Sequence, residues 1–268
     1  MEKKLDNIKM IFLDIDGTLY NTKKEVTEYT KNILNKVKLK EINIVLCSGR
    51  SNQSVCTISK QINASKYIIA NNGAFVYNYV DNVEIFESVI EEELLYKMWD
   101  ICEQENIELI LESKEQEYIN TLIFRKELDG YIKINNIRDI LDKKIFQIVI
   151  NMEKNRENKK IRDMLSNEEK IWTPNYGIGV RSFFFDINNT NIDKGIGIQH
   201  LIEKLGIKKE ETIAFGDGIN DCAMFKECGI GVAMENAKDE LKNIADYITL
   251  KNDEDGVARF IEKHILDN

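Results

Sequence analysis

The stretch KMIFLDIDGT, residues 9–18, decides the fold of this chain. Its apolar part, residues 9–13, predicts a short buried strand, and the polar part from Asp14 onward predicts a turn that contains glycine. Asp14 and Asp16 stand two positions apart, so both carboxylates can face the same edge of a sheet while Ile15 points into the protein. We therefore expect a strand that delivers two carboxylates to one edge of a sheet.

The same pattern, a short apolar run ended by small or polar residues, recurs along the chain. Further strands are predicted at residues 43–47, 67–70, 212–215, 230–234 and 247–250, and helices at 27–38 and 195–205. Buried strands that alternate with helices indicate an α/β fold, a doubly wound and mostly parallel sheet with helices on both faces. Ligands bind such sheets outside the carboxyl ends of the strands, so the polar residues there are expected to converge.

The middle of the chain has a different pattern. It predicts helices at residues 90–106 and 155–165, and strands at 107–111, 145–151, 177–181 and 183–187, without a paired-aspartate signature. We interpret residues 83–187 as an inserted α+β domain. Residues 1–82 and 188–268 then form the other domain together.

Charge and composition exclude several classes of protein. The 268 residues carry a formal net charge of -9, whereas a general nucleic-acid binder needs a basic surface. No apolar run approaches the ~20 residues of a membrane span, and the five cysteines form no C-x-x-C pair. We expect a soluble, cytoplasmic protein with no nucleic-acid or membrane partner. The sequence does not predict its oligomeric state.

Asp14 and Asp16 suit phosphoryl chemistry. A carboxylate at a strand end can bind Mg²⁺, which prefers oxygen ligands, and it can also attack phosphorus. Asp217 follows a predicted strand and could complete a metal site, with Asp221 supporting it from behind. The sequence therefore predicts a magnesium site at the carboxyl edge of the sheet.

Three other polar residues at predicted element ends could hold a phosphate group. Ser48 and Asn72 each follow a predicted strand and can donate hydrogen bonds to phosphoryl oxygens. Lys194 precedes the predicted helix at residues 195–205 and could neutralise both the attacking carboxylate and the phosphate. Each of these residues alone is more often an ordinary turn or surface residue, so only their joint occurrence indicates a site.

Taken together, these stretches resemble the haloacid dehalogenase-like hydrolase superfamily, specifically its Cof-type phosphatases with a C2-type cap. The resemblance covers nearly the whole chain. Its motifs stand in the family's order: DIDGT at 14–18, CSGR at 47–50, NNGA at 71–74, DKG at 193–195 and GDGIND at 216–221. It implies a Rossmann-like catalytic core, formed by residues 1–82 and 188–268, with residues 83–187 as the inserted cap.

The resemblance also implies roles for individual residues. Asp14 would be the nucleophile and Asp16 the general acid and then the base, and we expect Asp16 to be buried, because burial favours the protonated form of a carboxyl group. Mg²⁺ would be held by Asp14, the main-chain carbonyl of Asp16 and Asp217, with Asp221 behind them. The residues expected to contact the substrate are Ser48, Gly49, Asn72, Lys194 and Asn220, of which Ser48 and Lys194 also act in catalysis.

The sequence thus predicts a magnesium-dependent phosphatase that hydrolyses a small phosphorylated metabolite, a sugar phosphate or a phosphorylated cofactor, through an aspartyl phosphate. Two alternatives stay open. A phosphotransferase such as a phosphomutase would use the same aspartate nucleophile. A receiver-type signalling domain also accepts phosphate on a strand-end aspartate, although ~120 residues suffice for one.

Overall fold

The computed structural model describes residues 5, 7–121, 130–153, 171–172, 176–178 and 182–267. The chain divides into two compact units. The first comprises Met1–Arg50, Ser54–Phe86 and Asp193–Asn268, and the second comprises Ser51–Gln53 and Glu87–Ile192. The helix predicted at residues 155–165 lies outside the described residues.

The described strands of the first unit form one sheet, in the order β15-β14-β13-β1-β2-β3-β4-β5. The strands from β15 to β3 run parallel, and β4 returns antiparallel to β3. This confirms the predicted α/β class and the mostly parallel sheet. The strands are β1 (Met10–Leu13), β2 (Asn43–Cys47), β3 (Tyr67–Ala70), β4 (Phe75–Asn78), β5 (Val83–Glu87), β13 (Thr212–Gly216), β14 (Ile230–Ala233) and β15 (Tyr247–Ile248).

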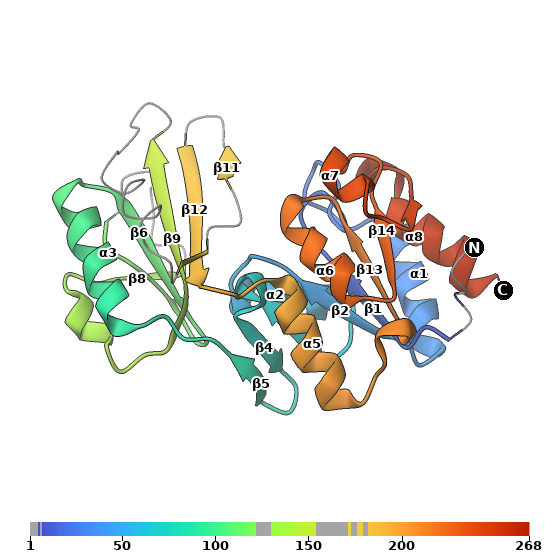
Figure 1. Ribbon diagram of the computed structural model, residues 1–268, viewed down its shortest axis with the longest axis horizontal. Helices are drawn as coiled ribbons and strands as arrows, with labels where there is room; N and C mark the ends of the chain where they lie inside the picture. Colours follow the sequence, from blue (N-terminus) through green and yellow to red (C-terminus); the bar gives the residue numbers. More distant parts are fainter. Residues whose placement is uncertain are drawn as a thin grey trace. The chain divides into compact units, whose positions relative to one another are not determined.

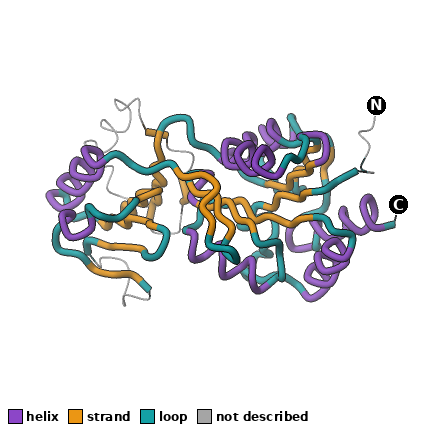
Figure 2. Tube along the Cα trace, turned by 90° about the horizontal axis from the view of Figure 1, so that it is seen from below, coloured by secondary structure: helices purple, strands orange, loops and turns teal. Residues whose placement is uncertain are grey.

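Helices cover both faces of this sheet (Figures 1 and 2). On one side α1 packs against α8, and on the other α5 packs against α6. The described helices of this unit are α1 (Glu28–Leu39), α2 (Asn52–Gln61), α5 (Lys194–Leu205), α6 (Cys222–Glu227), α7 (Asp239–Lys242) and α8 (Gly256–Ile261), which continues as a π-helical turn (Glu262–Leu266). Two covered faces explain why β1 and β13 are buried along their whole length.

Local sequence signals determine where the two longest helices of this unit begin. At α1 the Thr27 hydroxyl accepts a hydrogen bond from the backbone N–H of Thr30, at 3.0 Å, and caps the helix. At α5 the Asp193 carboxylate accepts from the N–H of Ile196, at 2.9 Å. Gly206 ends α5 in a left-handed conformation, with φ of 64°. The cap at Asp193 makes Lys194 the first residue of α5.

The second unit is an α+β structure (Figure 1). Its described strands follow the order β10-β12-β9-β6-β7-β8, with β11 paired to β12. The central pairs, β12 with β9 and β9 with β6, are antiparallel. The elements are α3 (Glu92–Gln104), β6 (Glu108–Ser113), β7 (Glu117–Ile119), β8 (Tyr131–Lys133), β9 (Ile145–Glu153), β10 (Ile171–Trp172), β11 (Tyr176–Ile178) and β12 (Ser182–Asn189).

The core of the second unit lies between α3 and one face of its sheet. Leu95, Met98 and Cys102 of α3 belong to the same buried cluster as Leu111 of β6 and Ile148 of β9. These helix positions are three or four residues apart, which is the spacing of one helix face. The apolar periodicity of residues 90–106 therefore predicted α3 correctly, with ends that differ by two residues.

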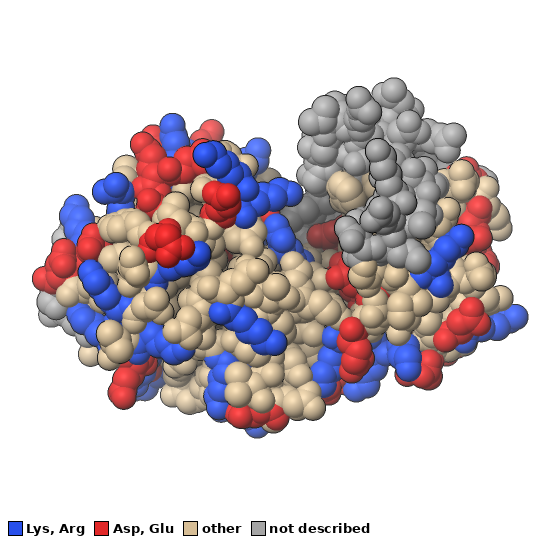
Figure 3. Space-filling model, turned by 180° about the vertical axis from the view of Figure 1, so that it is seen from behind, with Lys and Arg blue, Asp and Glu red and all other residues tan. Residues whose placement is uncertain are grey.

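On the molecular surface, basic and acidic side chains are interspersed over the face shown in Figure 3. Within the described ranges, no helix combines the length and the apolar character that crossing a membrane requires.

Candidate active site

The candidate site lies at the carboxyl end of β1, the strand of the first sheet from which the strand order proceeds to β2 on one side and to β13 on the other. β1 is paired on one side with β13 and on the other with β2, so that Leu13 is level with Phe215 and with Leu46. The residues that follow these three strands therefore leave the sheet at the same edge. In parallel sheets this position, beside the strand where the order reverses, forms a ligand-binding crevice.

A buried ammonium group joins two of the predicted carboxylates. The Lys194 Nζ atom donates to Asp14 Oδ1 and to Asp221 Oδ1, at 2.6 Å in each case. The lysine is 1% exposed, and the side chains of Asp14 and Asp221 are 9% and 1% exposed. A lysine at the first residue of a helix is disfavoured by the helix dipole. Its position is explained by the two carboxylates that it neutralises.

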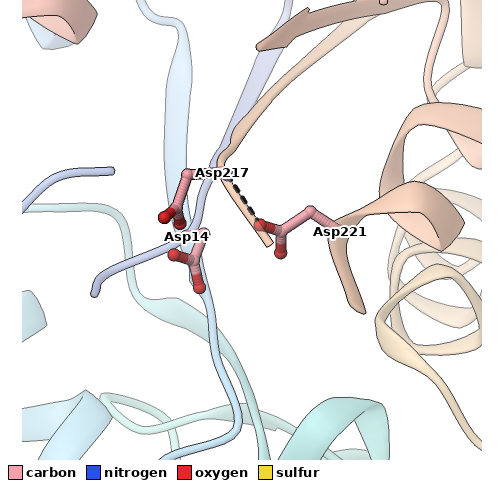
Figure 4. Close-up of side chains that lie close together, drawn as sticks. All are labelled: Asp14, Asp217 and Asp221. Carbon is pink, nitrogen blue, oxygen red and sulfur yellow. Dashed lines mark hydrogen bonds between the residues drawn. The ribbon is translucent and has the colours of Figure 1, made fainter. Parts of the chain in front are cut away.

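Asp221 uses both of its oxygens inside the protein. While Oδ1 accepts from Lys194, Oδ2 accepts from the backbone N–H groups of Asp217 and Gly218, at 2.9 Å each. Figure 4 shows the bond from Asp217 to Asp221. Asp221 is also fully buried. This carboxylate therefore fixes the turn that carries Asp217, together with the lysine, and it has little capacity left for a ligand of its own.

Asp217 projects toward Asp14 (Figure 4). Its Oδ1 atom accepts a hydrogen bond from the Thr18 hydroxyl at 3.2 Å, and a side chain at Gly17 would collide with its carboxylate. The glycine, which has φ of 83°, thus provides the space into which Asp217 extends. The DIDGT turn and the GDGIND turn are therefore fitted to each other.

The donor set suits a hard divalent cation. One carboxylate oxygen from each of Asp14, Asp217 and Asp221 lies within 4.8 Å of the other two. Such a set consists of oxygen atoms alone, which is the donor type that Mg²⁺ prefers. The residues present at this edge therefore fit a magnesium ion.

Burial changes the acidity of these groups. It raises the pKa of Asp14, and the negative charges of Asp221 and Asp217 add to the rise, while Lys194 opposes it. Burial and the neighbouring Asp221 raise the pKa of Asp217 from 3.8 to about 6. For Lys194 burial lowers the pKa, but Asp14 and Asp221 outweigh that effect and hold the pKa above its usual value. The lysine therefore stays charged at every physiological pH.

These shifts predict a pH dependence for magnesium binding. Protons compete with a cation for carboxylates whose pKa is raised, so the affinity falls as the pH falls through about 6, the pKa of Asp217. From Asp217 alone we expect binding near pH 5.5 to be about fourfold weaker than near pH 7.5. Isothermal titration with Mg²⁺ measures this. Equal affinity at both pH values would contradict the assignment, and the Asp217→Asn variant should bind more weakly with a flatter pH profile.

Asp16 does not have the environment that we expected from the sequence. Its side chain is 53% exposed, and it forms a two-pronged ion pair with Arg50, with Nε to Oδ2 and Nη2 to Oδ1 both at 2.6 Å. The expected burial is therefore wrong. The physical reason is that Arg50, stacked over the ring of Tyr20 at 5.4 Å, offers a planar pair of donors at the surface.

Arg50 is the functional candidate that the sequence interpretation missed. It stands in the CSGR motif, but no role was given to it, since its contact with Asp16 spans 34 positions of the chain. Thr18, which contacts Asp217, was missed for the same reason. The signal that could have found Arg50 is its place directly after Ser48 and Gly49 at a strand end.

A second group of predicted residues lies together next to β2 and β3. Ser48 is 2% exposed, and its hydroxyl accepts from the backbone N–H of Arg50 at 3.3 Å. The amide of Asn72 lies against Gly49, and its Oδ1 atom accepts from Asn220 Nδ2 at 3.5 Å. Asn72 is fully buried and Asn220 is partly exposed. The structure therefore brings the predicted residues together in two clusters, one of charges and one of neutral hydrogen-bonding groups.

Comparison with known proteins identifies the family. Residues 11–261 match the family described as haloacid dehalogenase-like hydrolase. The chain belongs to the haloacid dehalogenase-like hydrolase family. This confirms the family that the five sequence motifs indicated, and it makes the protein an enzyme of the hydrolase class.

Members of this family with solved structures share the fold over almost the whole chain. A haloacid dehalogenase-like hydrolase from Bacteroides thetaiotaomicron has a TM-score of 0.84 and 27% identity, over 96% of this chain and 99% of its own. A sugar phosphatase of subclass IIB has a TM-score of 0.80 and 26% identity, over 95% and 98%. By sequence alone, the chain is also similar to the 5-amino-6-(5-phospho-D-ribitylamino)uracil phosphatase YcsE of Bacillus subtilis, with 28% identity over 260 residues, 97% of each chain.

Proposed function

We propose that this hydrolase is a magnesium-dependent phosphatase that transfers the phosphoryl group of a small metabolite to Asp14 and then to water. One observation carries the proposal. The carboxylate of Asp14 is buried at the carboxyl end of the central strand, with Lys194 at 2.6 Å and Asp217 within reach of the same cation. A nucleophile needs this combination, because both the carboxylate and the phosphate ester are negatively charged.

The first half of the reaction forms a phospho-aspartate. A carboxylate oxygen of Asp14 attacks phosphorus, the bond between phosphorus and the ester oxygen breaks, and Asp16 protonates the departing oxygen. For that step the contact between Asp16 and Arg50 has to open, since an ion-paired carboxylate has no proton to give. Because the side chain of Asp16 is 53% exposed, its carboxylate stays in contact with solvent when the ion pair opens.

In the second half Asp16 acts as a base. It takes a proton from a water molecule, the oxygen of that water attacks phosphorus, and the bond between phosphorus and Asp14 breaks to release inorganic phosphate. Asp14 is then restored as a carboxylate and Asp16 as an acid. The two aspartates are thereby returned to their starting states, and the net reaction is hydrolysis of one ester bond.

The remaining residues hold charge and orientation. Asp14, the main-chain carbonyl of Asp16 and Asp217 would hold Mg²⁺, with Asp221 behind them. When bound, the ion supplies neutralisation of negative charge on the phosphoryl oxygens. The proposed contacts to the phosphoryl group are those of Ser48, Gly49, Lys194 and Asn220. Asn72 was also expected to contact the substrate, but its amide lies against Gly49 and Asn220.

For the substrate we propose a phosphorylated sugar, or a cofactor precursor or cofactor with a phosphorylated polyol chain. Support comes from two relatives with full-length matches, the ribitylaminouracil phosphatase and the sugar phosphatase named above. The assignment of residues 1–82 and 188–268 to catalysis, and of residues 83–187 to recognition of the rest of the substrate, stays a prediction.

The test is release of inorganic phosphate from a panel of such esters by the purified protein. We expect turnover with Mg²⁺ and none in the presence of a chelator, without any added acceptor. Release that requires an acceptor molecule would instead indicate a phosphotransferase. A stable phosphoprotein that forms once and releases no phosphate would indicate a signalling domain and contradict the proposal.

A further inference from the structure

Three consecutive residues between β3 and β4 adopt left-handed backbone conformations. Asn71, Asn72 and Gly73 have φ values of 52°, 54° and 99°. Among the residues that the structure describes, Asn71 and Asn72 are the only two neighbouring non-glycine residues with positive φ. A non-glycine residue in this region costs on the order of 1–3 kcal/mol, and such costs concentrate at functional sites. All three residues are buried, Asn71 and Asn72 completely, so these conformations do not belong to an exposed loop.

The turn is bonded to the loop that carries Ser48. The backbone N–H of Asn72 donates to the carbonyl of Ser48 at 3.1 Å, and the N–H of Asn71 donates to the carbonyl of Arg50 at 3.0 Å. Between these two bonds the side chain of Asn72 lies so close to Gly49 that a Cβ atom there would be 2.8 Å from its Oδ1. The left-handed backbone thus directs two backbone N–H groups toward Ser48 and Arg50, and the side-chain amide of Asn72 toward Gly49 between them.

The same turn contacts the two other segments of the proposed phosphoryl site. A side chain at Gly73 would collide with the carbonyl of Asp193, the residue before Lys194. On its other side, Asn72 Oδ1 accepts from Asn220 Nδ2 at 3.5 Å. One strained turn therefore touches the loop of Ser48, the start of α5 and the side chain of Asn220.

We propose that Asn72 is a positioning residue of this site, which acts through Gly49 and Asn220 and does not itself contact the substrate. Its amide is fully buried and lies against Gly49 on one side and the side chain of Asn220 on the other. The left-handed backbone lets the amide point at both partners at once, and the conformational cost is offset by the three segments that it aligns. The inference rests on the proposed function, because Ser48, Gly49 and Asn220 are there the phosphoryl contacts.

The central test is the Asn72→Gly variant. Glycine adopts positive φ without strain, which offsets part of the stability lost with the buried amide, so the protein should stay folded without that amide. We expect kcat/KM for p-nitrophenyl phosphate to fall about tenfold or more, because a displaced hydrogen-bond donor weakens transition-state binding. A Asn72→Gly protein that is folded and has the wild-type kcat/KM would overturn the inference.

Asn106→Gly is the matched control. Asn106 has nearly the same φ, 51°, but it is exposed and lies beyond the end of α3 in the second unit. Glycine at this position should relieve the same left-handed backbone strain, and kcat/KM should not change. A loss in this variant equal to that of Asn72→Gly would show that relieving a left-handed residue is enough to lower activity, and would contradict the role of the Asn72 amide.

A double-mutant cycle separates positioning from general packing. If Asn72 acts through Asn220, then Asn72→Gly should cost much less in an Asn220→Ala background than in the wild type. Purely additive losses would contradict action through Asn220. Should Asn72→Gly fail to fold, Gly49→Ala disturbs the same contact from the opposite side and should lower kcat/KM similarly. An active Gly49→Ala enzyme would then overturn the inference.

Calorimetric titration with inorganic phosphate supplies a readout that needs no turnover. We expect weaker phosphate binding in Asn72→Gly and unchanged binding in Asn106→Gly. Equal affinity in wild type and Asn72→Gly would overturn the positioning role, even if the enzyme were inactive on every ester tried. Failure of the proposed function would show itself differently, as a wild-type protein without magnesium-dependent phosphate release.

Discussion

Replacing Asp14 with asparagine is expected to lower kcat by on the order of 10⁴-fold or more, which is the scale seen when an enzyme loses its nucleophile. The amide has the size of the carboxylate but cannot attack phosphorus. The fold should survive, because Asp221 remains at 2.6 Å from the Lys194 ammonium group. Steady-state phosphate release, together with circular dichroism and a melting curve, measures both parts.

The matched control is Asp100→Asn, the same chemical change at an exposed position of α3. It should leave both rate and stability unchanged, since surface substitutions usually alter stability by less than about 0.5 kcal/mol. A folded Asp14→Asn protein that keeps more than about one hundredth of the wild-type rate would contradict a nucleophilic role for Asp14, because the residual activity would require another attacking group.

The second large effect is expected for Lys194→Met. Methionine has a similar length and no charge. In the wild type Asp14 and Asp221 share the ammonium group of Lys194, so in the variant two buried carboxylates would lack a positive partner. Breaking a buried ion pair in this way costs about 3–5 kcal/mol. Activity should fall strongly as well, because the charge that neutralises both nucleophile and ester is gone. Urea denaturation and phosphate release measure the two effects separately.

A compensating variant tests the cause of the instability. Lys194→Met combined with Asp221→Asn removes one of the two buried negative charges, so part of the lost stability should return while activity stays low. The deficit of the single variant should also shrink as the pH is lowered, since burial raises the pKa of Asp14 and protonation removes its charge. A Lys194→Met protein as stable as the wild type would contradict the central position given to the lysine.

The parallel sheet and the cluster around Asp14 could be predicted because their signals are local. β2 and β3 were predicted with their observed ends, since each is an apolar run bounded by polar or small residues. β4 was missed because it follows β3 after only the four residues 71–74, and the reversal needs left-handed asparagines that no short sequence pattern predicts. Sequence reasoning therefore gave the direction of the sheet but not its antiparallel edge.

What could not be predicted depends on contacts between distant segments. The burial expected for Asp16 was wrong because Arg50, from the next strand end, pairs with it at the surface. The burial of Asn72 behind Gly49 could not be predicted either, because it depends on how the turn after β3 meets the loop after β2. In both cases the residue type and its position at a strand end indicated a functional site, but the sequence did not show which residue it would contact.

The most direct test of the central claim is a crystal structure of the protein with Mg²⁺ and beryllium fluoride, a mimic of the phosphoryl group. We expect the fluoride complex to be attached to a carboxylate oxygen of Asp14, with Lys194 and Ser48 in contact with its fluorine atoms and Mg²⁺ beside Asp217. A mimic bound away from residue 14, or an ion held by other residues, would contradict the claim.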